Sequence, residues 1–138
     1  MTYPSTPMTQ LQIDAFLSDV RNAVLATNRQ DGAPQLSTVW YLYERGLVYI
    51  GFDANSAKHR NIARDPRVSF CVGGEHPDSR TVTIYGAARF VEPNDPRFHD
   101  IAEKIGLRYS QSHEVVQSEI ERKLIVINSE KTLAKDYN

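Results

Sequence analysis

The sequence is poor in several features that would place a protein in a special class. Among its 138 residues there is one cysteine, Cys71, so an internal disulfide is excluded, which suits a reducing compartment. No apolar run approaches the roughly 20 residues that a helix needs to cross a bilayer. The first seven residues lack the basic region and apolar stretch of a secretory signal. Together these absences predict a cytoplasmic protein that does not bind a membrane.

Neither sign of charge is in excess, because 16 lysines and arginines are balanced by 17 acidic residues. Broad nucleic-acid binding leaves a basic excess, so this class is excluded. The four histidines lack the spacing of metal ligands, and a single cysteine does not complete a set, so no metal site is expected. No Ser-His-Asp or Cys-His arrangement can be recognised, and no catalytic side chain is assigned.

Six short segments are rich in β-branched and aromatic residues and are bounded by turn signals. These predicted strands are residues 23–27, 35–43, 47–52, 67–72, 81–91 and 123–127. Asp31-Gly32 and Arg45-Gly46 are typical of hairpin turns, so the first three strands form an antiparallel meander. Gly86, in the middle of the longest strand, predicts a bulge or a bend.

Helices are predicted between and before these strands. Residues 9–21 form an amphipathic helix that begins with a capping box of Thr9 and Gln12. A short helix covers residues 56–64 and ends before a proline, and a third covers residues 95–109. The pattern of residues 112–121 does not distinguish a helix from a loop, and the tail after the last strand is polar.

The strands follow one another without alternating with long helices, which disfavours a parallel sheet. The sequence therefore predicts a mainly β protein, a six-stranded antiparallel barrel with peripheral helices. Its length fits a single domain over residues 1–138, with residues 1–8 as a flexible lead.

The short helix at residues 56–64 begins with charges of the unfavourable sign. Lys58 and Arg60 fall in its first turn, where the helix dipole disfavours exposed cations by roughly 0.3–1 kcal/mol each. Backbone N–H groups, a capping hydroxyl from Ser56 and two cations are the parts of a phosphate site. The alternative is that these cations are solvated and paired with carboxylates elsewhere. The preceding strand favours the phosphate site, because Gly51 permits a flat ring to approach the backbone while its phosphate reaches the helix.

Two ordered blocks of the sequence resemble a known superfamily. The run Asp31-Gly32-Ala33-Pro34-Gln35-Leu36-Ser37-Thr38-Val39-Trp40-Tyr41 is similar to the second-strand signature of the pyridoxamine 5′-phosphate oxidase-like, FMN-binding split-barrel proteins. The run Ser56-Ala57-Lys58-His59-Arg60-Asn61-Ile62, followed by Arg64-Asp65-Pro66-Arg67-Val68, resembles their phosphate-binding turn and next strand. Both blocks are close to the branch that binds the deazaflavin F420. The resemblance is good over residues 12–92 and weak over the C-terminal third.

The resemblance implies a homodimeric split barrel with two FMN sites at its interface, or F420 sites as the alternative. The implied phosphate contacts are Lys58, helped by Ser56 and by Arg60 or Asn61. The implied contacts along the ring and ribityl chain are Gln35, Ser37, Thr38 and Val39, with Ile50, Gly51 and Phe52 flanking the ring. The implied contacts to the partner subunit's cofactor are Arg80 and Thr81, with Arg122 or Lys123 as a weaker candidate.

These expectations describe an oxidoreductase that transfers a hydride between the cofactor and a small organic substrate, in which the cofactor supplies the chemistry. One alternative is a flavin carrier or sensor without turnover, and another is an unliganded barrel that binds a protein. Oxidation of pyridoxamine phosphate is disfavoured. The strand has Gln35-Leu36-Ser37-Thr38-Val39-Trp40 in place of Arg-x-x-Leu-Leu-Lys, and the long C-terminal substrate-binding extension is not found.

Overall fold

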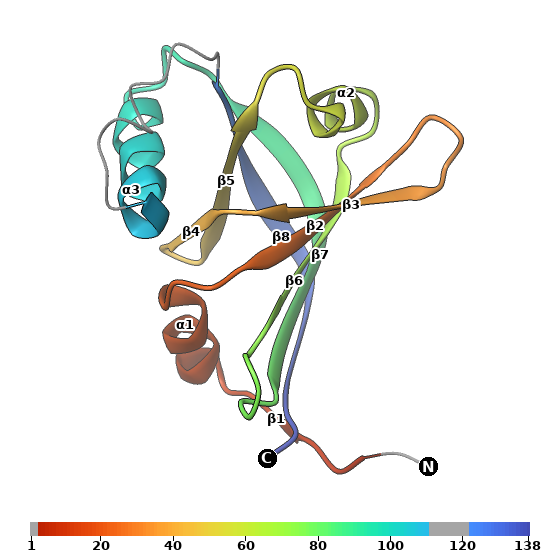
Figure 1. Ribbon diagram of the computed structural model, residues 1–138, viewed down its shortest axis with the longest axis vertical. Helices are drawn as coiled ribbons and strands as arrows, with labels where there is room; N and C mark the ends of the chain where they lie inside the picture. Colours follow the sequence, from red (N-terminus) through yellow and green to blue (C-terminus); the bar gives the residue numbers. More distant parts are fainter. Residues whose placement is uncertain (1–2, 111–121) are drawn as a thin grey trace.

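The computed structural model is a curled antiparallel sheet flanked by three helices, and it describes residues 3–110 and 122–138 (Figure 1). The strands are β1 (Thr6–Pro7), β2 (Ala23–Asn28), β3 (Pro34–Val39), β4 (Tyr41–Glu44), β5 (Leu47–Asp53), β6 (Arg67–Gly73), β7 (Arg80–Val91) and β8 (Arg122–Asp136). The helices are α1 (Gln10–Ser18), α2 (Ala57–Arg64) and α3 (Phe98–Ser110). The predicted mainly β class is confirmed, as are the three predicted helices with shorter bounds. The ambiguous residues 112–121 lie outside the described residues.

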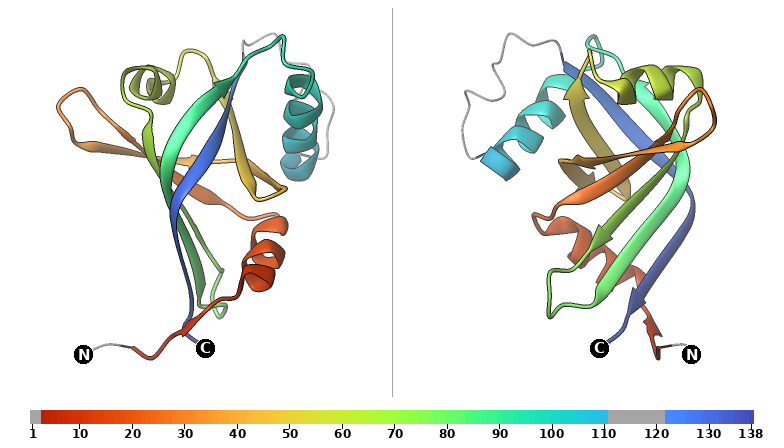
Figure 2. Two further views of the ribbon diagram at one scale, coloured as in Figure 1. Left: turned by 180° about the vertical axis from the view of Figure 1, so that it is seen from behind. Right: turned by 45° about the vertical axis from the view of Figure 1, so that its right-hand side comes forward.

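Over the described residues the sheet has eight strands, so the predicted number of six was wrong. Its order is β3-β2-β6-β7-β8-β5-β4, with β1 beside β8, and the neighbouring strands are antiparallel. The predicted strand at residues 35–43 is divided at Trp40 into β3 and β4, which stand at opposite ends of this order. Because one residue joins them, the two ends of the sheet are drawn together and the sheet curls into a half-barrel (Figure 2).

The last predicted strand, residues 123–127, is much longer in the structure and includes most of the polar tail. β8 continues to Asp136 and pairs with β7 from Val91↔Leu124 to Arg80↔Asp136. The main chain supplies this pairing, so exposed polar side chains are compatible with it. The tail also fixes the end of the expected flexible lead, because β1 pairs with it and Met8 N–H donates to the Ala134 carbonyl at 3.0 Å.

Local signals in the sequence are confirmed at three positions. Thr9 and Gln12 exchange both capping-box hydrogen bonds, at 3.2 and 2.9 Å. The β7–β8 register shifts at Gly86, where an added Cβ would lie 2.1 Å from the Asn128 carbonyl oxygen. Arg45 and Gly46 form the β4–β5 turn with positive φ angles of 54° and 78°.

The core has two parts. One fills the barrel and includes Phe16, Leu25, Tyr41, Ile50 and Phe70, all of which are fully buried. The other lies under α3 and is formed by Leu42, Tyr49, Val91, Phe98, Ile101, Ile105, Leu124 and Val126. Both α1 and α3 lie on the side of β4 and β5, whereas α2 sits near the base of the projecting β2–β3 hairpin (Figure 1). Among the described helices, none combines the length and the apolar character needed to span a membrane.

Candidate functional site

The start of α2 has the geometry of an anion site. Ser56 is the N-cap, as predicted, and its hydroxyl accepts a hydrogen bond from the His59 backbone N–H at 3.4 Å. The first turn holds no acidic residue. Even with this cap, other backbone N–H groups of the first turn have no intrahelical partner, and these groups and the helix dipole favour a negative charge.

The cations around α2 differ in what they contact. The Lys58 ammonium lies 5.9 Å from the centre of the Phe52 ring, and it forms no ion pair with any residue that the structure describes. The Arg60 guanidinium donates to the Asn55 carbonyl at 3.2 Å. Arg67, in contrast, is paired with Asp65 through two hydrogen bonds of 3.0 and 2.8 Å. Lys58 and Arg60 therefore both lack a carboxylate partner among the described residues, and Lys58 is the one of the two that forms no hydrogen bond with them.

Asn61 lies one turn further along α2 and faces the sheet. Its side-chain amide donates to the Thr27 hydroxyl at 3.1 Å and to the Gln35 side-chain oxygen at 2.9 Å. Its own oxygen accepts from Arg64 at 2.9 Å. In this structure the Asn61 side chain contacts protein groups at both ends, and its expected contact with the cofactor phosphate stays a prediction. The same contacts bring Gln35 to α2, as the predicted site requires.

The predicted residues of β3 are divided between the two faces of the strand. Gln35, Ser37 and Val39 alternate toward the inside, whereas Leu36 and Thr38 are exposed on the outside. Successive side chains of a strand point to opposite faces. Thr38 therefore points to the opposite face of β3 from the other three, and the expected contact of all four residues with the cofactor stays a prediction.

The predicted ring-flanking residues of β5 are packed inside the protein. Ile50 and Phe52 point into the barrel and are 0% and 5% exposed. Gly51 faces α3, where an added Cβ would lie 4.0 Å from the Ile105 Cδ1 atom. The side chains of Ile50 and Phe52 are thus core residues, because the strand is covered on both faces. Phe52 nevertheless underlies Lys58.

Arg80 and Thr81 lie far from α2 within one chain. His59 contacts Phe90, with ring centres 5.2 Å apart, and Arg80 is ten residues away along β7, which is about 33 Å of extended strand. Arg80 forms two hydrogen bonds with Asp78, at 2.8 and 2.7 Å, which together hold the pKa of that carboxyl down at about 2. The expected contact of Arg80 and Thr81 with the cofactor of the partner subunit stays a prediction.

The weaker candidates Arg122 and Lys123 stand closer to the helix start. They pair with Asp53 and Phe52, at the end of the strand that leads into α2. Their placement follows from strand register, which the sequence alone did not define.

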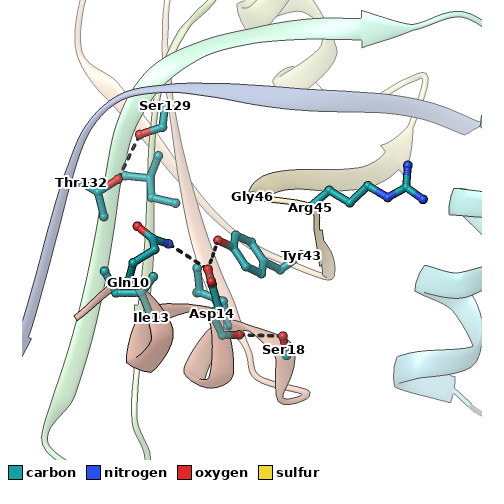
Figure 3. A pocket seen from close by; sticks show the side chains of 11 residues that line it. Gln10, Ile13, Asp14, Ser18, Tyr43, Arg45, Gly46, Ser129 and Thr132 are labelled. Atoms are coloured by element: carbon teal, nitrogen blue, oxygen red, sulfur yellow. Dashed lines mark hydrogen bonds between the residues drawn. The ribbon is translucent and has the colours of Figure 1, made fainter. Parts of the chain in front are cut away.

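A pocket of about 710 Å³, separate from the start of α2, opens between α1, the β4–β5 turn and strands β7 and β8 (Figure 3). Asp14 lines it and accepts from the Tyr43 hydroxyl at 2.5 Å and the Gln10 amide at 2.8 Å, and these bonds lower the pKa of the Asp14 carboxyl. Arg45 extends away from this pair (Figure 3). Because a carboxylate faces the pocket, it is a poorer phosphate site than the start of α2. Sequence reasoning missed it, since its lining comes from separate segments with no common motif.

Comparisons with known proteins agree with the fold. A family model described as pyridoxamine 5′-phosphate oxidase matches residues 10–136. The conserved hypothetical protein Rv2991 from Mycobacterium tuberculosis superimposes with a TM-score of 0.82 at 29% identity, over 95% of this chain and 86% of that one. A FAD-binding protein from Mesorhizobium loti gives 0.76 at 17% identity, over 96% of each chain. A protein described as F420 reductase gives 0.63 at 19% identity, over 86% of this chain and 94% of the other. The last two similarities establish a shared fold.

Proposed function

Because the chain belongs to the pyridoxamine 5′-phosphate oxidase family, we propose that it binds a flavin-type cofactor, FMN or alternatively F420, with the cofactor phosphate at the start of α2. The observation that carries this proposal is Lys58, a cation in the first helical turn with no carboxylate partner among the described residues. A flavin-binding protein and an F420 reductase among the proteins of the same fold support the choice of cofactor.

The residues present fit such a group. A phosphate at the start of α2 would accept from backbone N–H groups of the first turn and from the Lys58 ammonium. The side chains of Gln35 and Ser37, on the inward face of β3, would meet the part of the cofactor next to the phosphate. Since β5 offers Gly51 between two core residues, contact with the ring there would come from the main chain.

The proposed reaction is the transfer of a hydride between the bound cofactor and a small organic substrate. The cofactor supplies the hydride chemistry, while the protein binds it, orients it and limits access of water. The alternative is a carrier or sensor that binds the cofactor without turnover. Rapid reoxidation of the reduced protein by an organic acceptor would distinguish the enzyme from the carrier.

A homodimer would complete this site, and the outer face of the sheet is the surface we propose for it. One row of paired residues crosses five strands and carries no charge: Thr38, Val24, Cys71, Thr83 and Leu133. Leu36 and Tyr85 lie beside this row and are 68% and 42% exposed. Lys131 and Lys135 flank Leu133 on β8, so the uncharged surface is bordered by cations at this end, as a polar rim borders an interface. Thr81 lies on the same strand face as Thr83, which favours its role toward the partner's cofactor.

The cofactor proposal is tested by Lys58→Ala. Loss of a charge-assisted contact of about 1.5–3 kcal/mol should weaken FMN binding by tenfold or more. Riboflavin, which lacks the phosphate, should bind the variant and the wild type equally. Arg67→Ala is the matched control, because this cation is already paired with Asp65. Spectra of the chromophore released from the purified protein by denaturation identify FMN or F420.

Two results would contradict the proposal. One is a wild-type protein that retains and binds neither FMN nor F420. The other is an equal loss of FMN and riboflavin affinity in Lys58→Ala, which would place the lysine away from the phosphate.

A further inference from the structure

The contacts beneath α2 determine the orientation of two side-chain amides. Asn61 is 6% exposed and Thr27 is fully buried. Arg64 donates to the Asn61 oxygen, so the Asn61 nitrogen must face Thr27 and Gln35. Arg64 is itself held by the Asn28 carbonyl at 2.8 Å. An amide with each end matched to a partner of the opposite kind has one favourable orientation.

This orientation also decides which end of Gln35 meets Asn61. The Gln35 oxygen accepts from Asn61, and the Gln35 amide nitrogen forms no hydrogen bond with the residues that the structure describes. Gln35 is half-buried on the inward face of β3. Its two N–H groups are therefore donors available to a ligand.

These donors stand near the candidate anion site. Lys58 and Asn61 are three residues apart on α2, so they lie on one helix face with Cβ atoms about 5–6 Å apart. A molecule whose phosphate meets Lys58 would pass Gln35 within a few bonds of that phosphate. The ribityl chain found there carries hydroxyl oxygens, which accept hydrogen bonds.

We propose that Asn61 is a positioning residue that turns the Gln35 amide so that its NH₂ group donates to an acceptor oxygen of the bound cofactor. This inference rests on the proposed function. It replaces a direct contact of Asn61 with the phosphate by an indirect one through Gln35. The buried Asn61 and Thr27 then determine that β3 presents a hydrogen-bond donor, and not an acceptor, to the cofactor.

The substitution Asn61→Asp tests the proposal because it should turn the Gln35 amide around, so that Gln35 presents an acceptor to the cofactor in place of a donor. A carboxylate only accepts, so Gln35 would rotate to donate to residue 61 and would present its oxygen to the cofactor. The neighbouring Arg64 would pair with the new carboxylate, which favours retention of the fold. Asn61→Asp and Gln35→Ala should each lower the affinity for both FMN and riboflavin by about 3- to 10-fold. In the Gln35→Ala background, Asn61→Asp should change the affinity for riboflavin, which has no phosphate for the new carboxylate to repel, by less than about twofold.

Two further measurements separate positioning from a general structural role. Thr27→Val removes the other acceptor of the Asn61 amide and leaves the Gln35 contact, so the affinity should stay within about twofold of the wild type. In the protein without cofactor, the Gln35 side-chain amide resonances should shift in Asn61→Asp, as their protons bond to a carboxylate.

The outcomes distinguish this inference from the proposed function. Equal losses of riboflavin affinity from Asn61→Asp with and without Gln35, or unchanged Gln35 amide resonances, would overturn the positioning role alone. A wild type that binds neither FMN nor F420 would overturn the proposed function, and with it the role of Asn61 toward a cofactor.

Discussion

At the scale of single residues, two tyrosines of β4 couple the fold to pH. Burial raises the pKa of Tyr41 to about 12, and its hydroxyl donates to the Leu17 carbonyl at 2.9 Å. Burial and the hydrogen bond to Asp14 raise the pKa of Tyr43 to about 12 as well. Both values exceed the ordinary tyrosine value of about 10. The stability that these groups contribute is therefore complete below pH 10 and is lost as the pH rises through 12.

We expect an alkaline titration of the protein, followed by phenolate absorbance, to show the raised pKa values of Tyr41 and Tyr43. Of the seven tyrosines, Tyr41 and Tyr43 should ionise near pH 12 together with loss of the folded circular dichroism signal. Tyr43→Phe should remove one of the two late ionisations, whereas Tyr3→Phe, at an exposed residue, should leave both. Ionisation of all tyrosines around pH 10 in a protein that stays folded would contradict the assignment.

The sequence predicts those site residues whose signal is local. Ser56 and Lys58 are identified because a cap and a cation at a helix start can be recognised within four residues. The contact between Asn61 and Gln35 spans 26 residues and depends on how α2 packs on the sheet. Thr27 carried no signal, since a threonine in an apolar strand looks like an ordinary β-former.

At the scale of elements, the division between β3 and β4 comes from tertiary contacts. The residues from 35 to 43 form one continuous β-prone run, so the sequence predicted one strand. In the structure Trp40 stacks on Tyr109, with ring centres 5.1 Å apart. Arg108 donates to the Tyr41 carbonyl at 3.1 Å and to the carbonyls of Ser18 and Asp19 at 3.0 and 2.9 Å. The last turn of α3 thus binds the bend of the strand and the end of α1, and neither contact can be inferred from local sequence.

The bulge of β7 can be tested through Gly86. Its Cβ position lies 2.1 Å from the Asn128 carbonyl oxygen and 3.0 Å from the Asn128 carbonyl carbon, so Gly86→Ala must shift the backbone of β8. We expect a loss of about 1–3 kcal/mol in the free energy of unfolding, measured by urea denaturation. Gly73→Ala is the matched control, because the Cβ position there meets nothing within 4 Å. Its effect should stay within about 0.5 kcal/mol, and equal effects of the two changes would show that the clash at β8 is absent.

At the scale of the whole molecule, the fold class was predictable and the strand order was not. Adjacent β-prone segments separated by turns exclude a parallel sheet, which leaves antiparallel architectures. The order β3-β2-β6-β7-β8-β5-β4 places sequence neighbours β3 and β4 at opposite ends. That order depends on closing the sheet around Phe16, Tyr41 and Phe70, which come from three different elements. The extension of β8 over the polar tail follows from the length of its partner β7, not from its own residues.

The proposed homodimer is tested by a charge placed on the outer face of the sheet. Leu36 is 68% exposed and lies opposite Ala26, beside the uncharged row that crosses the sheet. In the dimer, Leu36→Glu would bury an unpaired carboxylate in each subunit, which should raise the dimer dissociation constant at least tenfold in analytical ultracentrifugation. Leu11→Glu, at a residue of α1 that is 80% exposed and outside this face, should leave the dimer intact.

If Arg80 and Thr81 contact the cofactor of the partner subunit, Leu36→Glu should also weaken cofactor binding at concentrations where the dimer dissociates, while Leu11→Glu should not. A wild-type protein that sediments as a monomer at all concentrations would remove the dimer and leave Arg80 and Thr81 without a role at the cofactor.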